Sequence, residues 1–187
     1  CIHCRLPEPH CVCSQLTQVS MPFSLMICSH AKEWQRNDNT GQWAVLTSPD
    51  IQRLKWHRKP ELINTSIELN ALDQVEGQYL LYPSDDAQDI KDLQANINRL
   101  WVIDGTWQEA QKMLNQSPWM KALAKVKIQG PSENQPLQSQ FKLRRNQRGL
   151  STLEAIEAAV AHQSPAASEG LKNNFNLIQA SLLKLMK

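Results

Sequence analysis

Four of the five cysteines lie within the first 13 residues, in the stretch CIHCRLPEPHCVC. The spacing C-x2-C-x6-C-x-C suits a tetrahedral zinc site, because each close pair can supply two thiolate ligands from one turn. A pair of disulfides is the competing interpretation, although 187 residues can form an ordinary core without such cross-links. A site closed by four ligands has no open coordination position, so we expect a structural zinc. The predicted ligands are Cys1, Cys4, Cys11 and Cys13, with His3 and His10 as alternatives.

A second candidate for chemistry is the segment RLWVIDGTWQEAQKML, residues 99–114. Its apolar run stops abruptly at Asp104, which is followed by Gly105. A carboxylate that closes a buried strand loses hydration energy unless it is paired or used. Gly105 allows a tight turn or the close approach of a ligand, and Trp107 adds a large flat side chain beside the acid. This corner therefore indicates a functional carboxylate.

Three segments predict a strand that turns directly into a helix: LLYPSDDA, VIDGTWQE and RGLSTLEAI. Ser84 is expected to cap the first helix, while Thr106 with Glu109 and Ser151 with Glu154 form capping boxes of the S/T-x-x-E type. In open α/β sheets, ligands bind beyond the carboxyl ends of the strands, where helix N-termini present free N–H groups. Each capping pair also has a purely structural interpretation, which stays open.

Predicted strands and helices alternate along the chain. This alternation predicts an α/β fold with a largely parallel sheet. The last predicted helix carries an apolar stripe at Leu171, Phe175, Ile178, Leu182 and Leu185. Strands are predicted over residues 23–29, 78–84, 100–103 and 126–129, and helices over residues 42–46, 86–98, 107–115, 150–162 and 169–187.

The net charge is only +2, from 20 Lys and Arg against 18 Asp and Glu, which argues against a protein that binds nucleic acid through bulk charge. Local basic faces remain, and a solvated surface is the alternative interpretation of each. The first comprises Arg53, Lys55, His57, Arg58 and Lys59 around Trp56, and the second comprises Lys142, Arg144, Arg145 and Arg148. No apolar stretch is long enough to span a membrane.

Taken together, the motifs resemble the DTW-domain family of tRNA-uridine aminocarboxypropyltransferases. The resemblance implies a SPOUT-like knotted α/β fold, in which a mostly parallel sheet is flanked by helices. It also implies a zinc knuckle over residues 1–20 and a catalytic domain over residues 21–187. The matching features, in the family's order, are the cysteine cluster, NTG at residues 39–41, LYPSDDA at residues 81–87, the D-x-T-W signature at residues 104–107 and LSTLEAI at residues 150–156.

The resemblance further implies the reaction. The 3-amino-3-carboxypropyl group of S-adenosylmethionine would move to N3 of a uridine in the tRNA variable loop, releasing 5′-methylthioadenosine, and Asp104 would accept the N3 proton as general base. Candidate substrate-binding residues are Arg36, Asn39, Thr40, Arg144 and Arg145, of which the arginines could bind the donor carboxylate. The candidate donor-binding residues are Leu81, Tyr82, Pro83, Ser84, Asp104, Gly105, Thr106, Trp107, Leu150, Ser151 and Thr152.

Several alternatives stay open. Trp107 could stack on the target base or pack beneath its corner, and His30 and Glu33 could line the pocket, with an ordinary strand-end role as the alternative for His30. The chain could instead be a SPOUT-type methyltransferase, an aminocarboxypropyltransferase of ribosomal RNA, or a zinc-containing RNA-binding protein without activity. We expect a cytoplasmic protein with tRNA as its partner, with no membrane association and no obligate protein partner.

Overall fold

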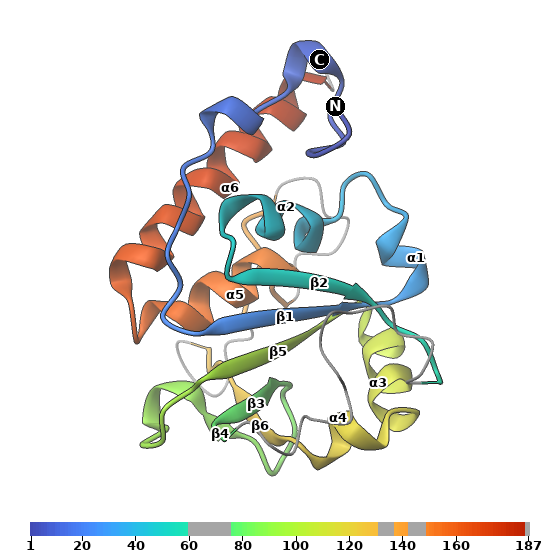
Figure 1. Ribbon diagram of the computed structural model, residues 1–187, viewed down its shortest axis with the longest axis vertical. Helices are drawn as coiled ribbons and strands as arrows, with labels where there is room; N and C mark the ends of the chain where they lie inside the picture. Colours follow the sequence, from blue (N-terminus) through green and yellow to red (C-terminus); the bar gives the residue numbers. More distant parts are fainter. Residues whose placement is uncertain (60–75, 131–136, 142–148, 186–187) are drawn as a thin grey trace. The chain divides into compact units, whose positions relative to one another are not determined.

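The computed structural model describes residues 1–59, 76–130, 137–141 and 149–185. Within these residues the strands form one six-stranded sheet in the order β2-β1-β5-β3-β6-β4, and all of its pairings are parallel (Figure 1). The predicted α/β fold, with a mostly parallel sheet flanked by helices, is therefore confirmed. The strands are β1 (Ser24–Ser29), β2 (Ile51–Lys55), β3 (Gln78–Leu81), β4 (Gln88–Asp89), β5 (Arg99–Asp104) and β6 (Ala124–Lys127).

Helices connect the strands along the chain, as predicted from the sequence. Those predicted over residues 42–46 and 107–115 and at the C-terminus are present with small shifts at their ends. The α-helices are α1 (Ala31–Trp34), α2 (Thr40–Thr47), α3 (Trp107–Asn115), α4 (Pro118–Ala122), α5 (Thr152–Ala161) and α6 (Pro165–Leu185), and the short 3-10 helices are η1 (Glu8–His10), η2 (Cys13–Gln15) and η5 (Ile90–Asp92).

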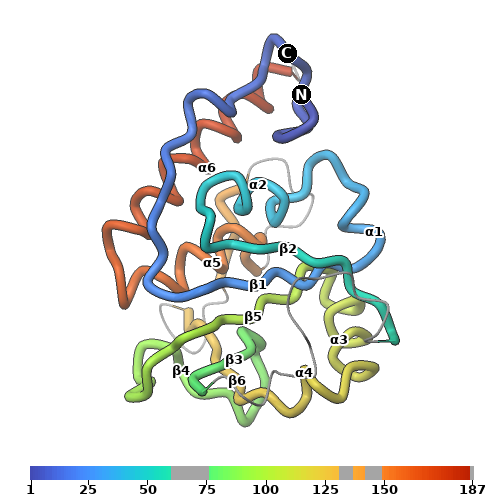
Figure 2. The backbone as a smooth tube through the Cα atoms, viewed as in Figure 1, coloured from blue at the N-terminus to red at the C-terminus, as the bar shows by residue number. Residues whose placement is uncertain are grey.

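The chain forms two compact units, each made of segments that are not contiguous in sequence. Figure 2 traces the backbone, coloured from the N-terminus to the C-terminus. The sheet unit contains Phe23–Arg36 and Asp50–Ile128, and the helical unit contains Cys1–Pro22, Asn37–Pro49 and Gln129–Lys187. The first 22 residues thus belong with α2, α5 and α6. The separate zinc-knuckle domain over residues 1–20 and catalytic domain over residues 21–187 stay a prediction.

In the sheet unit, β1 and β5 are buried almost throughout, as expected for central strands of a parallel sheet. One face of the sheet, which includes Met26 and Trp101, packs against Met113 of α3 and Met120 of α4. Trp101 also donates a hydrogen bond from Nε1 to Oε1 of Gln78 at 3.0 Å. This packing fixes the carboxyl ends of β1 and β5 beside α3.

In the helical unit, α5 and α6 pack against each other and both contact α2. Helix α6 also holds the N-terminal segment: Asn174 exchanges hydrogen bonds with the backbone N–H and C=O of Thr17, at 2.9 and 2.7 Å. The hydroxyl of Ser181 donates to the carbonyl of His10 at 2.8 Å. The predicted stripe on α6 is buried at its first three positions, whereas Leu185 at its end is exposed.

The helix predicted over residues 86–98, with Ser84 as its cap, is wrong. The chain makes a turn closed by a 3.0 Å hydrogen bond from the N–H of Ala87 to the carbonyl of Ser84, and then forms β4 and η5. Strand β4 pairs with β6, so a sheet edge takes the backbone hydrogen bonds that a helix would have used. Strand β2 was not predicted, because its apolar residues Ile51 and Leu54 are three positions apart and do not show the period-2 alternation of a strand.

Candidate functional site

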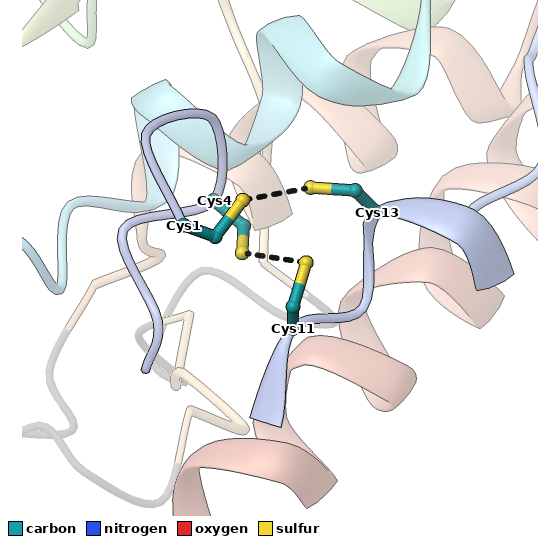
Figure 3. A group of neighbouring side chains, drawn as sticks. All are labelled: Cys1, Cys4, Cys11 and Cys13. Atoms are coloured by element: carbon teal, nitrogen blue, oxygen red, sulfur yellow. Dashed lines mark hydrogen bonds between the residues drawn. The ribbon is translucent and has the colours of Figure 1, made fainter. Parts of the chain in front are cut away.

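The four N-terminal cysteines converge in space, as Figure 3 shows. Their sulfur atoms all lie within 4.8 Å of one another, and the Cys1–Cys13 and Cys4–Cys11 pairs are each separated by 3.7 Å. Ligands about 2.3 Å from a tetrahedral zinc would lie about 3.8 Å apart, so the spacing fits such an ion. All five cysteines are free thiols, and 3.7 Å is far longer than a disulfide bond. The cluster can therefore bind a metal such as zinc.

Local structure brings these thiols together. Cys11 follows η1 and Cys13 begins η2, while Arg5 adopts a left-handed backbone conformation, φ 60°, that closes the first turn. The carbonyl of Cys4 accepts a hydrogen bond from Nε1 of Trp43 on α2 at 3.1 Å. Burial and the neighbouring thiols raise the pKa of Cys13 to about 11. In the described residues the cluster contains no histidine, so His3 and His10 are not part of it.

The carboxylate of Asp104, at the end of β5, forms a buried ion pair. Its Oδ2 accepts hydrogen bonds from Oγ of Ser29 at 2.7 Å and from Nη2 of Arg53 at 3.3 Å, and Asp104 is 2% exposed. Arg53 also donates from Nε to Ser29 at 2.7 Å and stacks over the ring of Trp34 at 4.7 Å. The predicted cost of burying Asp104 is therefore offset by pairing, and the pair joins β1, β2 and β5.

The predicted capping box after β5 is present. The N–H of Glu109 lies 3.4 Å from Oγ1 of Thr106, and Oε2 of Glu109 accepts from the N–H of Thr106 at 3.0 Å. Gly105 allows this tight turn, since a Cβ there would lie 3.2 Å from Cβ of Glu109. Burial acts to raise the pKa of Glu109. The hydrogen bonds from Thr106 and the nearby His30 and Lys32 together lower it by more, so the pKa lies below its usual value.

Two predicted donor-binding aromatics meet in the sheet unit. The rings of Tyr82, which follows β3, and Trp107, which opens α3, are stacked with centroids 5.5 Å apart and an interplanar angle of 10°. Tyr82 is buried, whereas Trp107 is 58% exposed. Trp107 therefore rests on Tyr82 through one face instead of being part of the core.

His30, considered from the sequence only as a pocket-lining or strand-end residue, lies at the centre of this region. It directly follows β1, and its backbone N–H donates to the carbonyl of Asp104 at 2.9 Å. Its Nδ1 lies 3.2 Å from Oε1 of Glu109, and its ring is stacked on Trp56 with centroids 6.1 Å apart. The sequence carries no direct signal for this cluster, because it depends on β1 lying beside β5.

The topology makes the carboxyl ends of β1 and β5 a switch point. These two strands are neighbours, and the chain leaving β1 returns as β2 on one side. The chain leaving β5 runs through α3 and α4 to β6 on the other side. Crevices for ligands in open α/β sheets form at such positions. The residues at this edge are therefore the best candidates for binding and chemistry.

The third predicted corner belongs to the helical unit. Ser151 and Glu154 form the predicted capping box, and Glu154 is buried. Its carboxylate also accepts from the hydroxyl of Ser139 at 2.7 Å and from the N–H of Gln140 at 2.6 Å. Glu154 thus binds the segment around residue 140 to the start of α5, while the donor-binding role of Leu150, Ser151 and Thr152 stays a prediction.

The predicted substrate-binding residues are only partly described. Arg36 pairs with Glu33 at 3.2 Å, and Oδ1 of Asn39 caps α2 by accepting from the N–H of Gln42 at 2.9 Å. Asn39 and Thr40 are both buried. Arg144 and Arg145 lie outside the described residues, as does the rest of the second basic face.

The first basic face needs a correction. The side chain of Arg53 is 3% exposed and committed to Asp104, and Trp56 is buried with its Nε1 donating to Ser117 at 2.9 Å. Neither side chain is therefore part of the exposed basic surface. The exposed members are Lys55, His57, Arg58 and Lys59.

The chain combines an α/β fold and a parallel sheet with a cysteine cluster that can bind a metal, and a comparison of sequences identifies its family. The family model for the DTW domain matches residues 1–183 of the chain. The protein therefore belongs to the DTW-domain family, and this membership indicates a tRNA-modifying enzyme. No solved structure matched the chain. Among the described residues, no helix has the length and apolar character needed to cross a membrane.

Proposed function

We propose that the protein transfers the 3-amino-3-carboxypropyl group of S-adenosylmethionine to N3 of a uridine in the tRNA variable loop. The observation that carries this proposal is the DTW-domain match over residues 1–183, with the signature residues at the carboxyl end of β5. That end adjoins the switch point of the sheet, where α/β proteins bind ligands. The donor and tRNA are both cytoplasmic, and we expect the protein there.

Within this proposal, the residues after β3 and β5 bind the donor. Trp107 and Tyr82 offer an aromatic surface beside the corner formed by Gly105 and Thr106. Leu81, Pro83 and Ser84 complete the corner after β3, and the corner at Leu150, Ser151 and Thr152 is assigned to the donor through the family resemblance. The SPOUT-like trefoil knot belongs to the same proposal. Arg36, Arg144 and Arg145 are the candidates for the donor carboxylate, with Asn39 and Thr40 as further substrate-binding residues.

The main demand of this reaction is positioning. The sulfonium of the donor is already a good leaving group, but its methyl carbon is less hindered than the γ-carbon of the methionine arm. The site must therefore present the γ-carbon to N3 and keep the methyl away from it. Holding two reactants in the productive geometry can supply about 7 kcal/mol or more of the barrier reduction.

The general-base role of Asp104 stays a prediction, and its surroundings weaken it. The Oδ2 atom already accepts two hydrogen bonds, one of them from the buried guanidinium of Arg53. Taking a proton there would neutralise the carboxylate that compensates the buried charge of Arg53, which is strongly unfavourable. The pair instead supports a role for Asp104 in fixing the backbone of the corner.

We propose zinc as the metal of the cysteine cluster, with Cys1, Cys4, Cys11 and Cys13 as ligands. The cluster supplies four thiols at tetrahedral spacing, so it would leave no position for a substrate. The role of zinc is then to stabilise the N-terminal segment. For tRNA, the exposed Lys55, His57, Arg58 and Lys59 are candidate phosphate contacts, and such contacts would make affinity fall steeply with salt.

The proposed function is tested by incubating the purified protein with total tRNA and S-adenosylmethionine labelled in parallel on the methionine carboxyl or on the methyl group. Aminocarboxypropyl transfer places only the carboxyl label in RNA, and mass analysis of the nucleosides identifies the product. Transfer of the methyl label instead would establish a methyltransferase. Labelling of ribosomal RNA alone would show that ribosomal RNA is the substrate in place of tRNA. RNA binding without donor binding would establish a non-catalytic protein.

A further inference from the structure

We infer that His30, oriented by Glu109, accepts the N3 proton of the target uridine. This inference rests on the proposed function and replaces Asp104 as the general base. It is carried by the position of His30 at the switch point, by its contact with a fixed carboxylate, and by the ring nitrogen that this contact leaves unused.

His30 is placed by the central strands of the sheet. It follows Ser29, which pairs in register with Asp104 at the end of β5. The hydrogen bond from the His30 N–H to the Asp104 carbonyl continues the β1–β5 ladder by one residue. Stacking on Trp56, which is itself buried, restricts the orientation of the imidazole. The ring is therefore held by rigid elements at the edge of the sheet where ligands are expected.

In this proposal, Glu109 selects the tautomer of the imidazole. Its Oε1 lies 3.2 Å from Nδ1 of His30, while Oε2 is fixed by the N–H and hydroxyl of Thr106 at 3.0 and 2.9 Å. The N–H of Lys32 donates to Nδ1 at 3.4 Å, which would require an unprotonated Nδ1; we place the proton on Nδ1 instead, because the contact with the Glu109 carboxylate is shorter and would be charge-assisted. With the proton on Nδ1, the Nε2 atom is the one that accepts.

The second ring nitrogen is available for this role. Within the described residues, Nε2 of His30 makes no hydrogen bond, and the side chain is 12% exposed. Asp104, whose backbone carbonyl accepts from the N–H of His30, has a buried carboxylate that is paired with Arg53. A carboxylate that orients an imidazole, leaving its other nitrogen to take a proton from the substrate, is a recurrent arrangement in acid–base catalysis.

The step balances as follows. Nε2 of His30 takes the proton from N3 of the uridine, and the N3 electron pair forms a bond to the γ-carbon of the donor. The bond between that carbon and sulfur breaks, and its electron pair neutralises the sulfonium to give the thioether 5′-methylthioadenosine. The imidazolium, stabilised by Glu109, then releases its proton to water.

The central experiment compares the wild-type protein with His30→Asn in single-turnover transfer from S-adenosylmethionine to tRNA. Asparagine is a good helix N-cap, so it can replace His30 at the start of α1 while removing the base. We expect the transfer rate to fall by about 10²-fold or more, the usual contribution of a general base, while donor and tRNA affinities are unchanged. His162→Gln, at an exposed histidine of the helical unit, is the matched control and should keep the wild-type rate.

Two further measurements separate catalysis from structure. The pH profile of the transfer rate should differ between the wild-type protein and His30→Asn, because the variant lacks the proposed base; the charged groups on the neighbouring elements are Glu109, Lys32, Arg53 and Asp104. Nitrogen-15 NMR should show the neutral ring protonated on Nδ1, and Glu109→Gln should shift that tautomer balance and slow transfer while keeping the contacts with Thr106.

The outcomes distinguish the two proposals. An active wild-type protein with a His30→Asn variant of near wild-type rate would overturn the role of His30 and leave the transferase intact. An Nε2-protonated neutral ring would do the same. A folded wild-type protein that binds donor and tRNA but transfers no aminocarboxypropyl group would overturn the proposed function and, with it, this inference.

Discussion

The capping boxes at the starts of α3 and α5 have the same sequence pattern but different surroundings. In the first, one oxygen of Glu109 binds Thr106, while the other lies beside His30 and Lys32. In the second, the carboxylate of Glu154 accepts from Ser139, Gln140 and the N–H of Ser151. A glutamate whose partners are all neutral donors is a structural link. A glutamate that faces an imidazole is in a position to influence proton transfer.

The corner at α5 thus serves stability, whereas the corner at α3 is also placed to serve chemistry. The helical unit should respond mainly in stability, since its corner is tied to the cysteine cluster through α2 and α6. The sheet unit should respond both in stability, through the Asp104–Arg53 pair, and in chemistry, through His30 and Glu109.

Metal removal is expected to have the largest effect, and to fall on the helical unit. Structural zinc in small sites binds with about 10 kcal/mol or more, and loss of the ion leaves four thiols crowded together. Stripping the metal with a chelator should lower the melting temperature and expose α2 and α6 to hydrogen exchange before β1 and β5. Zinc analysis of the purified protein provides the control. Equal loss of protection in both units would contradict the assignment of the cluster to the helical unit.

Asp104→Ala should have the next largest effect and should act on the sheet unit. The change leaves Arg53 buried without its partner, so we expect a loss of about 3–5 kcal/mol in the free energy of unfolding. Urea denaturation measures this loss. Asp104→Asn combined with Arg53→Gln, which removes both charges, should recover part of the stability. A fully stable Asp104→Ala protein would show that the ion pair does not hold β1, β2 and β5 together.

The two glutamates should then differ from each other. Glu154→Ala removes the acceptor of two buried donors, at Ser139 and Ser151, and of one part-buried donor at Gln140, so at about 1 kcal/mol for each buried donor we expect a loss of about 2–3 kcal/mol. Glu109→Ala removes one half of the capping box of α3 and should lower the free energy of unfolding by only about 1 kcal/mol. It should nevertheless slow transfer by more than Glu154→Ala does. Urea denaturation and single-turnover rates provide the two measurements. Equal rate losses would remove the distinction between the corners.

The smallest expected effect is the pH dependence of Glu109. Its pKa is lowered in the folded protein, so its ionised form stabilises the fold above the pKa of the unfolded side chain, about 4.3. That contribution is lost as the pH falls through the lower folded value. Glu109→Gln should therefore be less stable than wild type by about 1 kcal/mol at most near neutral pH, and the difference should vanish in acid. Glu169→Gln, at an exposed position of α6, should show no such convergence.

Much of the local structure could be predicted from the sequence. The spacing of four cysteines indicated the metal-ligating cluster, apolar runs located β1 and β5, and both S/T-x-x-E pairs proved to be capping boxes. The failures have local causes as well. The lack of period-2 alternation in β2 concealed a strand, and the acidic residues after Ser84 suggested a helix where the chain instead adds an edge strand.

The sequence alone therefore specifies the features that depend on neighbouring residues, namely periodicity, helix capping and closely spaced thiols. The tertiary structure decided which side chains at the strand ends meet. Asp104 pairs with Arg53 and Glu109 faces His30 because β1 lies between β2 and β5. Strand order and register join residues more than 50 positions apart, and no local pattern along the chain encodes such contacts.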